Sequence, residues 1–260
     1  MLKYHHKTLF CPSEPVDLKN QQQKYITMKT TLLSLTLLFT LSFTKIHAQN
    51  DLSAKQIIEK NIDATGGKTY LLSIKTLYSN MATEMEGRKV NWITREMLPN
   101  KGSFEIVYQG RTVFHNFYDG KKGYELSDGK KQLADQAEFS DKKFRRNIFN
   151  ELDYLDSTLY TLELAGSDKV EAQDCFKVKA SCTNGTIRML YYSKKTFLQL
   201  REDKSTTEKG GFDTTYFSGF KKYGKLTYYT DIVFGDGDKK QTAKMVDLLV
   251  NEKVIEDDFH

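Results

Sequence analysis

The chain has 260 residues, of which 39% are hydrophobic and 28% are charged, and its formal net charge is +5. Six of the 39 basic residues and two of the 34 acidic residues lie in residues 1–48, which leaves 33 basic and 32 acidic residues in the remainder. The remainder is therefore nearly neutral, which removes the electrostatic case for a nucleic acid or another polyanion as partner. Basic pairs such as Arg145-Arg146 and Lys221-Lys222 are expected on solvated faces.

An apolar segment that begins at Met28 has the order of a secretory signal. Lys29 is followed by a run of thirteen mainly apolar residues, 31–43, and Ala48 provides a small residue before a cut. A signal needs an apolar stretch of about 7 to 15 residues, whereas a membrane span needs about 20. The alternatives of a span or a buried helix fit less well, because the run is too short and has no polar face. We predict a signal peptide over residues 28–49, cleaved near Ala48 or Gln49.

Residues 1–27 show no periodicity and contain two of the three prolines of the chain. We predict that they form an upstream extension outside the fold. Residues 50–260 then make one exported domain, long enough to bury a substantial core.

The first predicted element of this domain is a helix over residues 51–68. Asp51 or Ser53 can cap its N-terminus, isoleucines recur at helical spacing, and Gly66-Gly67 provides a left-handed end.

After this helix the hydrophobic period changes from that of a helix to two, the period of a strand. The predicted strands are 74–82, 88–97, 102–109, 111–118, 122–127, 158–165, 174–182, 186–193, 197–203, 212–219, 224–234 and 240–250. Short turns separate them, and Asn184-Gly185 predicts a two-residue type I′ hairpin. The pattern predicts a mainly β (α+β) fold: a curved antiparallel meander that forms an unclosed half-barrel.

One segment, residues 132–155, interrupts the meander with apolar residues at helical spacing. They are Leu133, Ala137, Phe144, Ile148, Leu152 and Leu155. We predict an amphipathic helix or helix pair that lies on the concave face of the sheet as a lid or plug.

Two cysteines, Cys175 and Cys182, remain once Cys11 leaves with the leader. They lie on one predicted strand, roughly 23 Å apart at about 3.3 Å per residue, which is too far for a disulfide. We expect two free, partly buried thiols.

The chain offers few residues for catalysis. The mature part has two histidines, and His115 is expected to be a hydrogen-bonded core or lumen residue. No metal-ligand spacing, nucleophile elbow or phosphate loop is present, and the Gly235–Lys240 segment, with Asp236 and Asp238, fits a turn better than a calcium loop. We therefore expect no enzyme, no metal and no cofactor.

Alternating strands carry an excess of aromatic and aliphatic side chains that would face the concave side of the sheet. The inward sets are Phe104, Ile106 and Tyr108; Ile187, Met189 and Tyr191; Leu226, Tyr228 and Ile232; and Val246, Leu248 and Val250, with Glu105, Arg188 and Asp247 expected to face water. A single curved sheet has no second sheet to fill its hollow, so helices or a ligand must fill it. The predicted cavity residues are Trp92, Phe104, Ile106, Tyr108, Val113, Phe117, Phe144, Ile148, Leu152, Met189, Tyr191 and Tyr228.

The order of elements resembles the LolA/LolB-like lipoprotein carriers. Four stretches, AKQIIEKNIDATGGKTYLLSIKTL, MLPNKGSFEI, DCFKVKA and VDLLVNEKVIEDDF, resemble outer-membrane lipoprotein-sorting-like periplasmic proteins of Bacteroidetes-type bacteria. The resemblance implies an unclosed β-barrel covered by helices, with a cavity that accepts lipoprotein acyl chains. It also implies a strand arginine that holds the lid, for which Arg95 is the candidate. This sequence departs from the family in one respect: it has no lipid-attachment cysteine of the kind found in the membrane-anchored acceptor.

The sequence thus predicts a non-catalytic periplasmic protein that binds a lipid, an acyl chain or a lipoprotein in cell-envelope biogenesis. It predicts an apolar ligand, an envelope protein as a further partner, no nucleic acid, and no transmembrane span after cleavage. The alternative is a protein-interaction or sensor module on the same fold, with a cavity filled by its own side chains.

Overall fold

The computed structural model describes residues 52–127, 129–206, 210–235 and 240–260. The described residues all belong to one compact unit, Leu52–His260. The upstream extension, the signal peptide over residues 28–49, and Asp236 and Asp238 lie outside the described residues, so what the sequence predicts for them stays a prediction.

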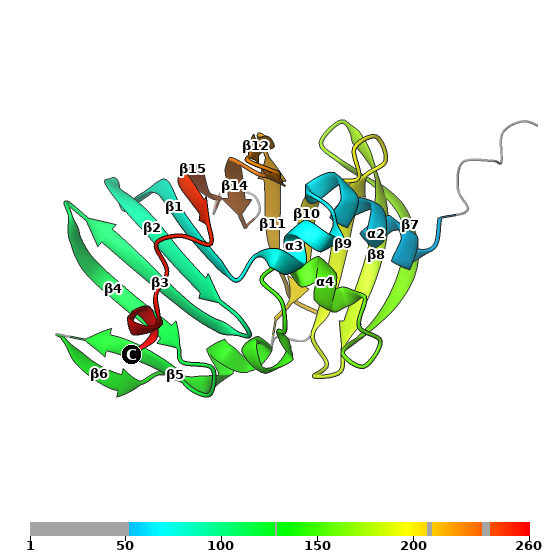
Figure 1. The fold of residues 1–260 in the computed structure, drawn as a ribbon. Coiled ribbons are helices and arrows are strands. Elements are labelled where there is room, and N and C mark those ends of the chain that lie inside the picture. Colours follow the sequence, from blue (N-terminus) through cyan, green and yellow to red (C-terminus); the bar gives the residue numbers. More distant parts are fainter. Residues whose placement is uncertain (1–51, 128, 207–209, 236–239) are drawn as a thin grey trace, which may run out of the picture. The chain divides into compact units, whose positions relative to one another are not determined.

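The described unit is built mainly of strands. These are β1 (Thr76–Met85), β2 (Arg88–Met97), β3 (Lys101–Tyr108), β4 (Arg111–Tyr118), β5 (Gly123–Ser127), β6 (Lys130–Leu133), β7 (Tyr160–Val170), β8 (Gln173–Cys182), β9 (Ile187–Ser193), β10 (Gln199–Ser205), β11 (Phe212–Ser218), β12 (Lys221–Tyr223), β13 (Leu226–Tyr228), β14 (Asp231–Phe234) and β15 (Gln241–Val250). Thirteen of them form one antiparallel sheet in the order β6-β5-β4-β3-β2-β1-β15-β14-β11-β10-β9-β8-β7, and β12 pairs with β13 in a separate hairpin. The edge strands β6 and β7 do not pair, so the sheet curves without closing into a barrel (Figure 1). The predicted fold class is confirmed.

Within the described residues, five helical segments accompany the sheet. They are α2 (Ala54–Thr65), α3 (Lys68–Ser73), η1 (Gln136–Phe144), α4 (Asn150–Tyr154) and η3 (Glu256–Phe259), of which η1 and η3 are 3₁₀ helices. Ser53 caps α2 in a capping box, because its Oγ accepts from the Gln56 amide at 3.2 Å while Gln56 Oε1 accepts from the Ser53 amide at 2.8 Å. Gly66 and Gly67 end α2 with φ angles of 155° and 89°, as the sequence predicts.

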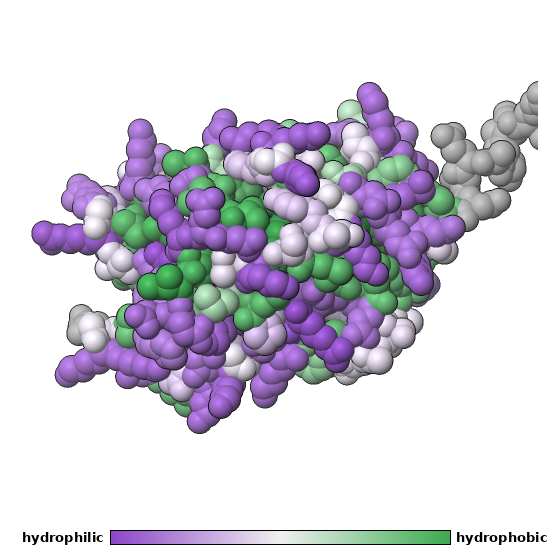
Figure 2. All heavy atoms as spheres, in the orientation of Figure 1, coloured by the Kyte–Doolittle hydropathy of each residue, from purple (hydrophilic) through white to green (hydrophobic). Residues whose placement is uncertain are grey.

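The main core lies between α2, α3, α4 and the sheet. Helix α2 contacts α4, β7 and β13, and in Figure 1 the three α-helices lie across the half of the sheet that ends at β7. Ile57 and Ile58 of α2 and Leu190 and Tyr192 of β9 are completely buried there. The face drawn in Figure 2 is largely hydrophilic, with apolar side chains gathered over β1 and β2.

Strand β9 presents the opposite face to the one predicted. Leu190 and Tyr192 enter the main core, while Met189 and Tyr191 pack on the other side of the sheet in a small cluster. That cluster also contains Val170, Cys175, Leu200 and Tyr216. The run Ile187–Ser193 is apolar at almost every position, so its sequence carries no period-two signal that could fix which side faces inward.

Strand β15 changes face at a bulge. Asn80 pairs with Asp247 and Met81 with Met245, which leaves Val246 as the extra residue. Val246 is 59% exposed, whereas Met245 and Leu248 on either side of it are buried. The prediction that Val246 points inward is therefore wrong, because a bulge shifts the alternation by one residue.

Of the two alternatives predicted for residues 132–155, an amphipathic helix or a helix pair, the structure has two short helices and not one continuous helix. Leu133 lies in β6 and is 59% exposed, and the extended backbone at Arg145 and Phe149 separates the short helices η1 and α4. The Asp153 carboxylate explains part of this interruption, because it accepts from the backbone amides of Arg146 and Asn147 at 3.1 and 3.3 Å. Such side-chain to backbone bonds favour a turn over a continuous helix. We call residues 134–155 the inserted segment.

Two further details differ from the prediction. The Asn184-Gly185 hairpin exists, but Gly185 has a positive φ of 92° while Asn184 is not among the described residues with positive φ. The turn is hence not type I′, and the Gly185 amide donates to the Cys182 carbonyl at 2.9 Å.

The predicted strand 224–234 is divided into β13 and β14. Both Cys175 and Cys182 are free and buried, as predicted.

Candidate functional site

A cavity of about 440 Å³ lies on the concave side of the sheet. Its walls come from α2, from β1, β2 and β3, from β10, β11 and β14, from the β12-β13 hairpin and from the inserted segment. The apolar lining is Leu77, Met81, Trp92, Phe104, Ile148, Phe149, Leu198, Phe217, Phe220, Tyr228, Tyr229, Ile232 and Phe234. The inserted segment thus lies over the hollow of the sheet, as predicted, although it has a different local structure.

The strands that form the wall supply the lining through regular alternation. Trp92, Thr94 and Glu96 of β2 all face the cavity, because side chains two apart in a strand share a face. The indole of Trp92 is edge-on to Phe104 of β3 at 6.1 Å and to Phe234 of β14 at 5.6 Å between ring centroids. The contact with Phe234 joins strands from the two halves of the sheet, whereas Phe104 lies on the strand next to that of Trp92.

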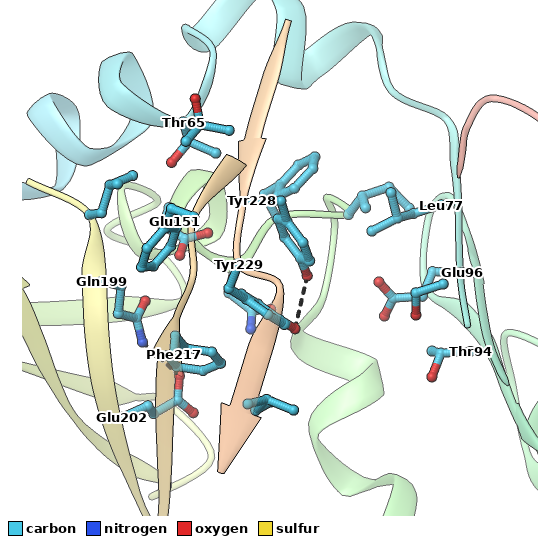
Figure 3. Close-up of a pocket in the computed structure, with 18 of the residues that line it drawn as sticks. Thr65, Leu77, Thr94, Glu96, Glu151, Gln199, Glu202, Phe217, Tyr228 and Tyr229 are labelled. Atoms are coloured by element: carbon cyan, nitrogen blue, oxygen red, sulfur yellow. Dashed lines mark hydrogen bonds between the residues drawn. The ribbon is translucent and has the colours of Figure 1, made fainter. Parts of the chain in front are cut away.

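Two adjacent tyrosines at the end of the β12-β13 hairpin enter the cavity. The rings of Tyr228 and Tyr229 are stacked with centroids 4.2 Å apart, and the Tyr228 hydroxyl donates to the Tyr229 oxygen at 3.2 Å (Figure 3). Tyr228 also meets Phe149 of the inserted segment, edge-on at 6.4 Å. Burial raises the pKa of Tyr229 to about 12, so this phenol stays protonated at neutral pH.

An ion pair joins the inserted segment to the wall of the cavity. The guanidinium of Arg145 binds the carboxylate of Glu96 on β2 and also donates to the Ile148 carbonyl. The side chains are only 19% and 17% exposed. Burial would raise the pKa of Glu96, but the charges of Arg145 and Lys142 and the hydrogen bond from Arg145 outweigh it and hold this pKa below its usual value.

A second carboxyl, Glu151 of α4, lines the cavity without an ion pair among the described residues. Burial, together with the negative charge of Glu202, raises the pKa of Glu151 to about 7. Figure 3 shows Glu151 and Glu202 on one side of the tyrosine pair and Glu96 on the other. Glu151 is therefore the acid in the cavity wall that changes charge near neutral pH.

The third carboxyl of the cavity is Glu202 of β10, which forms an ion pair with Arg188 of the neighbouring strand β9. Arg188 also donates to Asp141 of η1 at 2.9 Å, and its side chain is only 12% exposed. The expectation that Arg188 faces water is wrong, because Arg188 shares the inward face of β9 with Leu190 and Tyr192.

Four predicted cavity residues line this cavity: Trp92, Phe104, Ile148 and Tyr228. Eight do not: Ile106, Tyr108, Val113, Phe117, Phe144, Leu152, Met189 and Tyr191. Ile106 and Tyr108 share the face of Phe104 but lie further along β3, beyond the end of the cavity. Val113 is 60% exposed, and Leu152 is buried in the main core.

The remaining four of the eight lie elsewhere for structural reasons. Phe117 is buried on the opposite face of β4, where its ring stacks on Tyr124. Phe144 lines a separate surface hollow beside η1. Met189 and Tyr191 face the opposite side of the sheet because β9 has the reverse alternation.

Arg95 is on the face of β2 opposite to Trp92 and Glu96. Its guanidinium binds the Glu105 carboxylate, and its Nε lies 3.4 Å from Asp258 of η3. The prediction that Arg95 contacts the inserted lid is wrong, because β2 alternates and Arg95 points to the side covered by η3. Glu105 was predicted to face water, but its side chain is only 14% exposed, so that prediction is also wrong.

His115 lies beside this cluster and outside the cavity. Its Nε2 is 3.9 Å from Glu105 Oε1, is buried, and has no hydrogen-bond partner among the described residues. The hydrogen bond expected for this histidine is therefore not made at Nε2. Burial lowers the pKa of His115, with the charge of Glu105 acting in the opposite direction.

The sequence reasoning missed the polar residues of the cavity. Glu96 could have been found by extending the alternation from Trp92 along β2. Arg145 was expected on a solvated face with Arg146; Arg146 is indeed 58% exposed, but Arg145 turns inward. No pattern in the sequence indicates that Glu151 lines the cavity, because its position depends on how the short helix α4 packs against the rest of the fold.

Two properties of the described residues complete the site. None of their helices has the length and apolar character needed to cross a membrane. No group of three or more His, Cys, Asp or Glu side chains within the described ranges is placed to hold a metal ion.

The sequence matches no protein-family model and no curated protein. The structure is similar to the LolA superfamily protein NE2245 from Nitrosomonas europaea, with a TM-score of 0.56 and 10% identity over 80% of this chain and 98% of the other. It is also similar to a putative outer membrane lipoprotein-sorting protein domain from Vibrio parahaemolyticus, with a TM-score of 0.52 and 13% identity over 80% of this chain and 96% of the other. The Bacteroidetes-type origin stays a prediction. The chain thus has the LolA-like fold, a curved, unclosed antiparallel sheet whose hollow is covered by short helices.

Proposed function

We propose that this chain is an exported, periplasmic binding or carrier protein that takes a lipid, an acyl chain or the lipid part of a lipoprotein into its cavity during cell-envelope biogenesis, without catalysis. The observation that carries the proposal is the cavity of about 440 Å³ between the concave sheet and the inserted segment, lined mainly by aromatic and aliphatic side chains. Ligand pockets in proteins typically enclose about 300 to 1,000 Å³ and have such a lining.

The energetics of this lining suit an acyl chain. Each methylene group moved from water into an apolar site contributes about 0.8 kcal/mol. Flat apolar surface is provided by the stacked rings of Tyr228 and Tyr229 and by the indole of Trp92. Such surface can contact a ligand in many orientations. A flexible hydrocarbon chain can therefore bind here without specific polar chemistry.

The fold neighbours and the N-terminal segment support the biological setting. One neighbour is described as a putative outer membrane lipoprotein-sorting protein domain. The segment over residues 28–49 has the order of a secretory signal, which supports export.

The alternative is a protein-interaction or sensor module whose cavity is filled by its own side chains. That alternative leaves no room for a ligand, whereas the cavity here has a volume of about 440 Å³. The volume favours ligand binding over the filled module.

Binding of the uncharged fluorescent probe N-phenyl-1-naphthylamine tests the proposal. We expect the delipidated protein to bind the probe with increased fluorescence. Phe104→Glu and Tyr228→Glu place a charge in the cavity wall and should weaken binding at least about tenfold, since an unpaired buried charge is costly. Val113→Glu is the matched control, because Val113 is 60% exposed on the neighbouring strand. Failure of the wild-type protein to bind this or any other apolar probe would overturn the proposal.

A further inference from the structure

The charged groups that line the cavity are predominantly acidic. They are three carboxyls, Glu96, Glu151 and Glu202, and one guanidinium, Arg145. An apolar ligand with a polar end must place that end among these groups or leave it at the cavity mouth. Their state of pairing therefore determines which kind of polar end the cavity accepts.

The cation of the lining is already engaged. Arg145 binds the Glu96 carboxylate and the Ile148 carbonyl, and its Nε is buried without a partner among the described residues. An anionic group that reached this Nε would lie close to the Glu96 carboxylate as well. The pair therefore gives little net attraction for a carboxylate or a phosphate.

Two acceptors of the lining have by contrast no cation as partner. Glu151 forms no ion pair with any described residue, although its own backbone amide donates to its carboxyl. Asn61 of α2 is only 2% exposed, and its Nδ2 donates to the Phe197 carbonyl at 2.8 Å, which fixes the amide so that Oδ1 remains an acceptor. This Oδ1 has no partner in the described part of the chain. A buried acceptor without a donor is costly, and a donor from a ligand would remove that cost.

From these contacts we propose that the cavity accepts an amphiphile whose polar end donates hydrogen bonds and carries no negative charge, an amine or a hydroxyl, with Glu151 and Asn61 as its acceptors. The negative charge of a free fatty acid or a phosphate head group would be repelled by cavity carboxyls whose charge no nearby cation balances. The inference deepens the proposed ligand-binding function and rests on it.

The charge of Glu151 makes this preference depend on pH. Several charged or titratable groups act on it from neighbouring elements. They are Glu202 of β10, Tyr192 of β9, Tyr228 and Tyr229 at the hairpin, and Arg145, Asp153 and Tyr154 of the inserted segment. Because the pKa of Glu151 is about 7, this carboxyl is mainly protonated at pH 6 and mainly ionised at pH 8. An ammonium group should bind more tightly to the ionised form.

Displacement of N-phenyl-1-naphthylamine by dodecylamine, dodecanol and laurate at pH 6 and pH 8 tests the inference. An alkylammonium and a carboxylate keep their charges over this range, so the protein groups alone titrate. We expect dodecylamine to bind at least about tenfold more tightly than laurate at pH 8, and about tenfold more weakly at pH 6 than at pH 8. Dodecanol should bind more tightly than laurate at both values.

Two variants assign the effect to Glu151. Glu151→Gln should remove the pH dependence of dodecylamine binding and reduce its advantage over laurate about tenfold. Glu163→Gln is the matched control, since Glu163 of β7 is 66% exposed outside the cavity, and it should behave as the wild type. The pKa of Lys142 is lowered to about 8, mainly by burial, and any contribution from this lysine would persist in Glu151→Gln.

The outcomes separate this inference from the proposed function. If the fluorescent probe binds but laurate displaces it as well as dodecylamine does, the head-group inference is overturned and the binding function stands. If the probe does not bind, the binding function fails first. Should Glu151→Gln fail to fold, the pH series on the wild-type protein still decides, because equal dodecylamine affinity at pH 6 and pH 8 contradicts the role of Glu151.

Discussion

Arg145 of the inserted segment binds Glu96 of β2 through an ion pair that is largely shielded from water. The pair crosses from the segment that covers the cavity to the strand that forms its wall. The same arginine donates to the Ile148 carbonyl, so one side chain fixes both the position and the local shape of the inserted segment. The contact is therefore the strongest polar connection described between this segment and the β1–β3 side of the cavity.

Removing one partner of this pair should destabilise the protein more than removing an exposed charge. We expect Arg145→Met and Glu96→Gln each to lower the free energy of unfolding by about 3 kcal/mol, because each leaves a shielded charge without its partner. The measurement is urea denaturation at pH 7. Arg146→Met is the control, since Arg146 is 58% exposed and pairs with Asp156, and it should cost less than about 1 kcal/mol.

The double variant Glu96→Gln with Arg145→Met completes the cycle. The two changes should be less than additive, with a coupling energy of at least about 1 kcal/mol. Simple additivity would contradict the pairing.

The raised pKa of Glu151 should make the stability depend on pH. The pKa of this carboxyl is raised from 4.5 to about 7, so between these values the folded protein holds a proton that the unfolded chain has released. The free energy of unfolding then falls as the pH rises through this window, by up to about 3 kcal/mol from this group. Glu151→Gln removes this contribution, so the variant should gain stability relative to the wild type from pH 5 to pH 8. A constant difference between the two proteins over this range would show that Glu151 does not titrate as described.

Gly123 of β5 should not tolerate a side chain. A Cβ at this position would collide with the ring of Phe139, which stacks on Tyr118 with centroids 5.9 Å apart. The Gln136 side chain accepts from the Gly123 amide at 3.0 Å and donates to its carbonyl at 2.9 Å, which holds η1 against β5. We expect Gly123→Ala to cost about 1 to 3 kcal/mol, as overpacking does. Thermal unfolding of Gly123→Ala alone and combined with Phe139→Leu tests the cause: the second change should recover part of the loss, and no recovery would locate the strain elsewhere.

Arg95 should matter for stability and not for ligand binding. Its partners are Glu105 and Asp258, on the face of the sheet away from the cavity. We expect Arg95→Met to lower the free energy of unfolding by about 2 kcal/mol, the scale of hydrogen bonds to charged groups. The dissociation constant for N-phenyl-1-naphthylamine should stay within about twofold of the wild type. A large loss of probe binding in a folded variant would restore the lid-contact role predicted for this arginine.

The sequence was informative where turn signals mark the ends of a strand. Strands β2 and β4 begin and end where predicted, because Glu86-Gly87, the Pro99–Gly102 turn and Asp119-Gly120 bound them. Trp92 and Phe104, which were predicted to face the hollow of the sheet, lie in the wall of the cavity.

The sequence was uninformative where long-range contacts decide the outcome. Nothing local in the Ile187–Ser193 run fixes the inward face of β9, and nothing predicts the bulge that exposes Val246. Glu151 becomes buried only because α4 lies against α2 and the sheet. The polar half of the cavity follows from tertiary packing and could not be obtained from periodicity.

The pairing of β1 with β15 places the first and the last strand of the sheet side by side, and Leu77 lies opposite Val250. Most other neighbours in the sheet are also neighbours along the chain, so the groups β1–β6 and β7–β11 can each form through local hairpins. The contacts that join the two groups span most of the domain, and such distant pairings are slow to form. Because the cavity has walls from both groups, we expect it to be completed late in folding, after the last strand has paired with the first.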